Sequence, residues 1–164
     1  MLHFKVQCAQ FFYVITMSHS STDDTNTPQG DVLPAPGYAG DISCQTAYRW
    51  WQSGQAVLVD VRSSAELAWV GFVPGALCVP WKEWPGMALN PNFDEQLRAA
   101  VPPGKKVLML CRSGVRSIAA AQRAAQLGLQ AYNILEGFEG NPDANGQRNR
   151  VGGWRFHGLP WQQG

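Results

Sequence analysis

The feature that most constrains this chain is a short apolar run that ends in a cysteine. Residues 107–110 (Val-Leu-Met-Leu) follow a turn-like Pro-Pro-Gly at 102–104, a pattern typical of an interior parallel strand. Cys111 comes directly after this run. Strong helix formers fill residues 118–127, and Gly128 stands where a helix stop is expected. The sequence therefore predicts a strand, a loop and a helix, with Cys111 at the strand end.

The loop after Cys111 has the composition of a cradle for an anion or a thiolate. Free N–H groups at the start of a helix and the positive end of its dipole stabilise a negative charge. Arg112 and Arg116 add positive charge, and Gly114 lets the backbone turn its N–H groups inward. Such surroundings favour the thiolate form of a cysteine, although a buried structural thiol is the alternative. We therefore predict Cys111 as the nucleophile, and as substrate-binding residues Arg112, Ser113, Gly114, Val115, Arg116 and Ser117.

Residues 111–117 (Cys-Arg-Ser-Gly-Val-Arg-Ser) resemble the active-site loop of single-domain rhodaneses, a family of thiosulfate or persulfide sulfurtransferases. Residues 59–62 (Val-Asp-Val-Arg) and 71–76 (Gly-Phe-Val-Pro-Gly-Ala) are similar to an upstream signature of that family. Phe72 stands where the signature usually has a histidine. That histidine is not the family's nucleophile, so the change leaves the chemistry in place. The resemblance covers about residues 38–136, and the residues that follow resemble the tail of a bacterial subgroup.

The length of the loop separates this family from the cysteine-based phosphatases. Those enzymes need a loop one residue longer, with an arginine where this chain has Ser117. Here the arginine is Arg116, one position earlier. The shorter cradle suits a sulfur atom carried on the cysteine better than it suits a phosphate.

The resemblance implies an α/β fold with a rhodanese-like open parallel sheet of about five strands and helices on both faces. It implies transfer of a sulfane sulfur from a small anionic donor, such as thiosulfate, or from a persulfide. A Cys111 persulfide would carry the sulfur to cyanide, a thiol or a protein acceptor, without a cofactor. The alternative is a rhodanese-like regulatory, protein-binding or sulfur-relay module without free-standing turnover, which the intact cysteine disfavours. Asp60, Arg62 and Glu66 are expected to brace one another as structural support.

The cysteines are widely spaced and give no metal-binding pattern, so no metal is predicted. Cys44 and Cys78 are expected to be buried packing residues. The alternative is that one of them closes a disulfide with Cys111 under oxidation. Isolated thiols, including Cys8, favour a reducing compartment, which points to the cytoplasm.

Several further residues have two open interpretations. His157 is expected to be an exposed tail residue, with a general-base role as the alternative. The seven tryptophans are expected in the core or in pocket walls, and an aromatic collar around the cysteine is the alternative. The loop 140–150 carries Arg148 and Arg150, which either face solvent or form a docking edge. A net charge of +1 gives no reason to expect nucleic acid as a partner.

The 164 residues, of which 45% are apolar, suffice for one domain with a substantial core. We expect a flexible lead over residues 1–36, because Ser, Thr, Asp, Asn and Pro dominate its second half. Its apolar patch at 6–17 is too short to span a bilayer, and Met17 is an alternative translation start. The rhodanese-like domain is expected to occupy residues 37–164.

Strand-like and helix-like segments alternate along that domain, and this favours a parallel sheet with helices on both faces. Residues at the carboxyl ends of such strands form ligand sites, which is where Cys111 falls. We expect Asn92 to cap one of the helices. The expected strands are 39–42, 56–61, 76–79, 106–110 and 131–135, and the expected helices before the cysteine loop are 43–52, 65–70 and 92–100.

Overall fold

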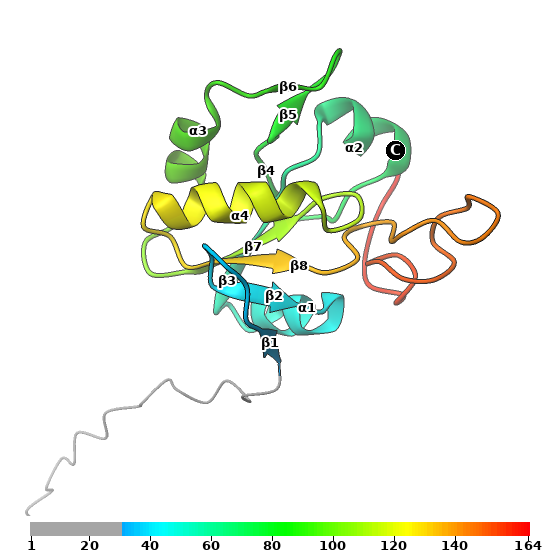
Figure 1. Ribbon diagram of the computed structural model, residues 1–164, viewed down its shortest axis with the longest axis horizontal. Coiled ribbons are helices and arrows are strands. Elements are labelled where there is room, and N and C mark those ends of the chain that lie inside the picture. Colours follow the sequence, from blue (N-terminus) through cyan, green and yellow to red (C-terminus); the bar gives the residue numbers. More distant parts are fainter. Residues whose placement is uncertain (1–30) are drawn as a thin grey trace, which may run out of the picture.

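A six-stranded sheet lies at the centre of the computed structural model, which describes residues 31–164 (Figure 1). Its strand order is β1-β2-β8-β7-β3-β4, and all neighbours are parallel except β1, which pairs antiparallel with β2. The predicted α/β fold with an open parallel sheet of about five strands is confirmed, and β1 adds a sixth, antiparallel strand at the edge. The strands are β1 (Val32–Leu33), β2 (Gly40–Ile42), β3 (Ala56–Asp60), β4 (Leu77–Cys78), β7 (Lys106–Leu110) and β8 (Ala131–Ile134).

Helices cover both faces of this sheet (Figure 1). Helix α1 packs on one face, and α3 and α4 pack together on the other. Because both faces are covered, four of the five residues of β7 and three of the five residues of β3 are buried and apolar. The helices are α1 (Cys44–Gln52), α2 (Ser64–Val70), α3 (Phe93–Ala100) and α4 (Arg116–Gln126), and a small hairpin adds β5 (Lys82–Glu83) and β6 (Ala88–Leu89).

Serine side chains define the starts of two helices. Ser43 caps α1 by accepting a hydrogen bond from the N–H of Thr46 at 3.1 Å. Ser63 and Glu66 form a reciprocal capping box at the start of α2. Asn92 does not cap α3 as predicted, because its backbone is not extended and its side chain makes no cap hydrogen bond.

The ordered fold begins earlier than the predicted boundary at residue 37. Val32 pairs with Ile42, so the chain joins the sheet edge five residues before that boundary. Residues 1–30 of the expected lead lie outside the described residues. The hairpin formed by β5 and β6 was also not predicted, because its two-residue strands show no alternation of polar and apolar residues. Within residues 31–164, no helix is both long enough and apolar enough to cross a membrane.

The C-terminal segment from residue 137 onward lies beside the carboxyl ends of the strands (Figure 1). Trp154 and Phe138 are fully buried against the α1 side of the sheet. The indole of Trp154 donates to the carbonyl of Pro160 at 2.9 Å. Gln162 and Phe72 exchange two backbone hydrogen bonds of 2.8 Å, which join the end of the chain to the segment after α2. This irregular segment is therefore part of the domain core.

Candidate active site

Cys111 is the first residue after β7, and its exposed fraction is only 1%. Two backbone hydrogen bonds from the segment after β8 hold the loop that follows Cys111. The N–H of Phe138 donates to the carbonyl of Cys111 at 2.8 Å, and the N–H of Glu139 donates to the carbonyl of Arg112 at 2.9 Å. These two hydrogen bonds fix the backbone at the start of the loop, because they hold the carbonyls of Cys111 and Arg112 in place.

The backbone N–H groups of residues 112–116 find no protein acceptor within residues 31–164. Helix α4 begins at the end of this loop, and its N-cap residue, Val115, makes no side-chain cap bond. Gly114 is buried with φ +84°, a conformation that glycine adopts without strain. An uncapped helix start with unused N–H groups is a favourable environment for an anion.

Gly137 packs directly on the loop and was not singled out as a site residue by the sequence. A Cβ atom at this position would lie 2.5 Å from the carbonyl oxygen of Cys111 and 2.6 Å from the nitrogen of Ser113. Its φ of +63° also disfavours any other residue. The loop conformation therefore depends on a residue 26 positions after the cysteine.

Ser117, in the first turn of α4, links Cys111 to a buried polar chain. Its hydroxyl oxygen lies 3.1 Å from Cys111 Sγ and 2.6 Å from Asn133 Oδ1. The amide Nδ2 of Asn133 donates to Asp41 Oδ1 at 2.8 Å, which leaves its oxygen facing Ser117. The single hydroxyl proton of Ser117 is therefore shared between Asn133 and the sulfur, and a thiolate would draw it to the sulfur. The sequence had not singled out Asn133 or Asp41.

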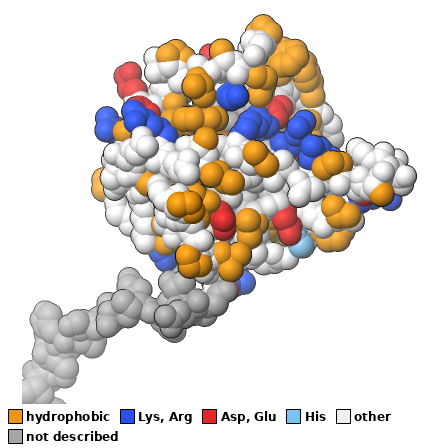
Figure 2. All heavy atoms as spheres, in the orientation of Figure 1, with side chains coloured by type: hydrophobic (Ala, Val, Ile, Leu, Met, Phe, Trp, Pro, Cys, Tyr) orange, Lys and Arg blue, Asp and Glu red, His pale blue; other side chains and the backbone are white. Residues whose placement is uncertain are grey.

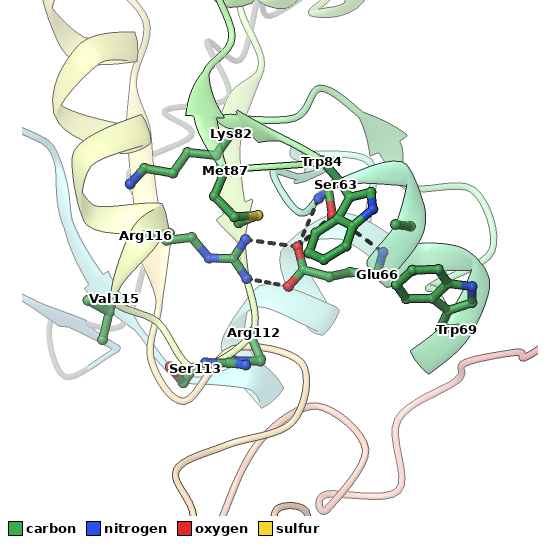
Figure 3. Close-up of a pocket in the computed structure, with 11 residues that line it drawn as sticks. Ser63, Glu66, Trp69, Lys82, Trp84, Met87, Arg112, Ser113, Val115 and Arg116 are labelled. Atoms are coloured by element: carbon green, nitrogen blue, oxygen red, sulfur yellow. Dashed lines mark hydrogen bonds and ion pairs between the residues drawn. The ribbon is translucent and has the colours of Figure 1, made fainter.

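Arg116 is bound to Glu66 rather than left free. Both guanidinium N–H groups of Arg116 donate to the carboxylate, one of them at 2.9 Å (Figure 3). Burial opposes ionisation of Glu66, but hydrogen bonds from Arg116 and Ser63 outweigh it and lower its pKa to about 2. The expectation that Glu66 braces Arg62 is wrong, because the carboxylate turns toward α4.

This ion pair gives a testable dependence on pH. The pKa of Glu66 is lower in the folded protein than its ordinary value of 4.5, so its stabilising contribution is complete above about pH 4.5. That contribution is lost as the pH falls towards 2. We expect Glu66→Gln to lower the free energy of unfolding at pH 7 by about 1–3 kcal/mol, and to flatten its decline between these pH values. Urea denaturation at several pH values measures both effects, and an unchanged acid decline in the variant would contradict the assignment.

Asp60 and Arg62 form the expected pair, and both side chains are buried. Arg62 Nη2 donates to Asp60 Oδ2 at 2.6 Å and to the carbonyl of Gly71 at 3.0 Å. The guanidinium also lies 4.0 Å from the centre of the Phe138 ring. The pair thus ties the end of β3 to the turn after α2 and to the C-terminal segment.

A pocket of about 580 Å³ opens beside the cysteine loop (Figure 3). Arg112 is exposed there and has no salt-bridge partner within the described part of the chain. Trp69 and Trp84 stand edge to face on the opposite side, with ring centres 5.8 Å apart. Trp69 and Trp84 thus lie in a pocket wall, while Trp50 and Trp154 lie in the core, as expected for the tryptophans. The lining residues are Ser63, Ala65, Glu66, Trp69, Lys82, Trp84, Met87, Arg112, Ser113, Val115 and Arg116.

The other thiols and the histidine stand apart from this pocket. Cys44 is buried as expected, and burial, with a contribution from Glu136, raises its pKa to about 12. Cys78 is exposed, contrary to prediction, because β4 is an edge strand of only two residues. His157 is half-buried rather than exposed, and its ring contacts Glu136 at 2.7 Å and Gln45 at 2.9 Å. Cys111 and the other two described cysteines are all free thiols.

Fold and site together define a class of protein. It is a mostly parallel α/β domain in which a buried cysteine ends a strand. The loop that follows leads into a helix, and its N–H groups have no acceptor within residues 31–164. The Rhodanese-like domain model matches residues 43–141, and the chain belongs to this sulfurtransferase family.

Three relatives illustrate the match. Rv0390 from M. tuberculosis, a crystal structure, has a TM-score of 0.72 and 44% identity, covering 77% of this chain and 99% of that chain. A rhodanese-related protein from Thermoplasma volcanium, at 21% identity and a TM-score of 0.51, covers 76% of this chain and 98% of its own, and shares the fold. An uncharacterized protein of Rickettsia prowazekii is 35% identical over 113 residues, or 67% of this chain and 85% of that protein.

Proposed function

We propose that this protein is a sulfurtransferase that moves a sulfane sulfur through a persulfide on Cys111. The observation that carries the proposal is the position of Cys111. It is buried, its sulfur lies 3.1 Å from Ser117 in the first turn of the uncapped helix α4, and the N–H groups of the loop between them have no acceptor within the described part of the chain. A terminal persulfide sulfur carries negative charge, and such N–H groups would stabilise it as an oxyanion hole stabilises oxygen. The isolated free thiols agree with a reducing cytoplasmic location, which we include in the proposal.

The reaction consists of two displacements. The Cys111 thiolate attacks the outer sulfur of thiosulfate or a persulfide, a new S–S bond forms, and the donor's S–S bond breaks. Sulfite or a thiolate leaves with the electron pair of that bond. Ser117 donates its hydroxyl to the cysteine sulfur during this step. Cyanide or a thiol then attacks the terminal sulfur and regenerates the Cys111 thiolate, so that the kinetics are ping-pong.

Intact-protein mass spectrometry tests this proposal directly. After treatment with thiosulfate or a persulfide donor, the protein should gain the mass of one sulfur atom, and cyanide should remove it. A protein that gains no sulfur from either donor would overturn the proposal. In that case, partner binding through the same loop becomes the function to test.

Arg112 is the better candidate for attracting an anionic donor, because Arg116 is held by Glu66. We expect Arg112→Gln to raise KM for thiosulfate by about 10- to 100-fold, since a charge-assisted contact contributes about 1.5–3 kcal/mol, and to change kcat less. Steady-state kinetics with cyanide as acceptor measure both constants. Arg98→Gln, on α3 and outside the pocket, removes the same charge and should leave KM unchanged. Equal effects of the two variants would remove Arg112 from this role.

A further inference from the structure

The pocket beside the cysteine loop is much larger than thiosulfate needs. Its volume of about 580 Å³ lies in the range of sites that enclose an organic molecule, whereas thiosulfate is a small tetrahedral anion. Cys111 directly precedes Arg112 and Ser113, which line this pocket, but it is not itself a lining residue, and only 1% of it is exposed. The surface that would hold the body of a substrate is thus separate from the sulfur that would react.

The wall of this pocket presents apolar surface to solvent. Trp69 from the last turn of α2 and Trp84 from the hairpin have exposed fractions of 65% and 57%. Met87 lies on the same hairpin, and Val115 of the cysteine loop stands across the pocket, also exposed (Figure 3). Exposed aromatic rings grouped around one concave site are typical of a surface that binds a ligand with an apolar body.

The same pocket carries excess positive charge. Of its charged residues, Glu66 is neutralised by Arg116, while Lys82 and Arg112 have no salt-bridge partner among residues 31–164. Figure 2 shows Lys and Arg side chains next to hydrophobic groups above the start of α4. A ligand that matches both the apolar wall and the positive charge of this pocket has an apolar body and an anionic group.

On this basis, and resting on the function proposed above, we propose that the pocket binds an organic thiol that carries the sulfane sulfur as R–S–SH. Its aromatic or aliphatic body R packs on Trp69 and Trp84, and a carboxylate on R pairs with Lys82. The Cys111 thiolate attacks the outer sulfur, and the bond between the two donor sulfurs breaks. The electron pair of that bond leaves as R–S⁻, so the total charge is unchanged and no oxidant is needed. In the reverse direction, the same thiol is the acceptor.

Three thiols of similar sulfur nucleophilicity separate the two parts of this recognition. They are 4-(mercaptomethyl)benzoate, benzyl mercaptan, which lacks the carboxylate, and 3-mercaptopropionate, which lacks the ring. The protein is first loaded with sulfur from thiosulfate or inorganic polysulfide, and loss of that sulfur is followed by intact-protein mass spectrometry. We expect 4-(mercaptomethyl)benzoate to unload the wild-type protein about tenfold faster than either partial thiol.

Two variants assign this preference to the pocket. Trp84→Ala should bring the rate with 4-(mercaptomethyl)benzoate to within about twofold of the rate with 3-mercaptopropionate. Lys82→Ala should bring the rate with 4-(mercaptomethyl)benzoate to within about twofold of the rate with benzyl mercaptan. Leu89→Ala is the control for Trp84→Ala, because it removes an exposed apolar side chain of the same hairpin outside the pocket. Lys105→Ala is the control for Lys82→Ala, because it removes an exposed lysine outside the pocket. Both control variants should keep the preference of about tenfold for 4-(mercaptomethyl)benzoate. Equal rates for the three thiols in a wild-type protein that cyanide still unloads would overturn this inference and leave the proposed function intact.

A binding measurement covers the case in which no persulfide forms. In the Cys111→Ser variant, titration calorimetry with the unreactive analogue 4-(methylthiomethyl)benzoate reports on the pocket alone. We expect saturable binding that Trp84→Ala or Lys82→Ala weakens by about tenfold. Binding of this kind without persulfide formation would support the pocket and overturn the proposed function. Absence of binding would overturn the inference about the pocket.

Discussion

Cys111→Ser should abolish both persulfide formation and turnover, because no other described thiol is placed under the loop N–H groups. A serine hydroxyl is not ionised at neutral pH and cannot hold a sulfane sulfur. We expect no gain of sulfur mass after thiosulfate and a loss of at least about a thousandfold in the rate of thiocyanate formation. Mass spectrometry and a colorimetric thiocyanate assay measure the two effects.

The matched control is Cys78→Ser, which removes the exposed thiol at the sheet edge. It should load and unload sulfur like the wild-type protein. Both variants should keep a Tm within a few degrees of the wild-type value, since the change from sulfur to oxygen preserves the shape of the side chain. Sulfur mass on the Cys111 variant, or loss of activity in the Cys78 variant, would contradict the assignment of the nucleophile.

The largest effect on stability is expected for Asp60→Asn. This change leaves the guanidinium of Arg62 charged and fully buried with a weaker partner. Removing one member of a buried ion pair costs about 3–5 kcal/mol, which is a large share of the stability of a domain of this size. Urea denaturation followed by tryptophan fluorescence measures the loss.

Two further variants show whether the cost comes from the unpaired buried charge. Asp94→Asn breaks an exposed ion pair with Arg123 and should have a much smaller effect. The double variant Asp60→Leu with Arg62→Met removes both buried charges and should recover much of the lost stability. If the double variant were as unstable as Asp60→Asn, then packing rather than charge would account for the loss.

The sequence predicted the parallel sheet well, because its longer strands are short apolar runs that alternate with helix-like segments. The segment β7, Cys111 and α4 lies where the pattern placed it, and Ser43 begins a helix as expected. The hairpin formed by β5 and β6 escaped prediction, because strands of two residues are too short for any period to appear. Residues in such short strands become β-strand because they pair with a neighbouring strand, and their own sequence does not indicate it.

The contacts around the cysteine were less accessible to prediction. Asn133 bonds both Ser117 and Asp41, and it reaches Asp41 because β2 and β8 are parallel neighbours in a register that pairs Asp41 with Asn133. Arg62 and Glu66 are close in sequence, but the arginine turns into the core beneath Phe138 and the carboxylate turns back to the start of α2. These contacts depend on the register between strands that are distant in sequence and on the direction of each side chain. Local sequence patterns predict neither of these.

The contacts of the segment after β8 affect local unfolding around the cysteine loop. Phe138 and Glu139 hold the cysteine loop through its carbonyls, Trp154 anchors the same segment in the core, and Gln162 joins it to Phe72. Detaching the end of the chain therefore removes supports of the loop, while the central strands keep their own hydrogen bonds. In terms of cooperative local unfolding, we expect the cradle and the C-terminal segment to open as one unit, at a lower free energy than the sheet. We therefore expect the stability of the cysteine loop to depend on residues 137–162, which follow it in the chain.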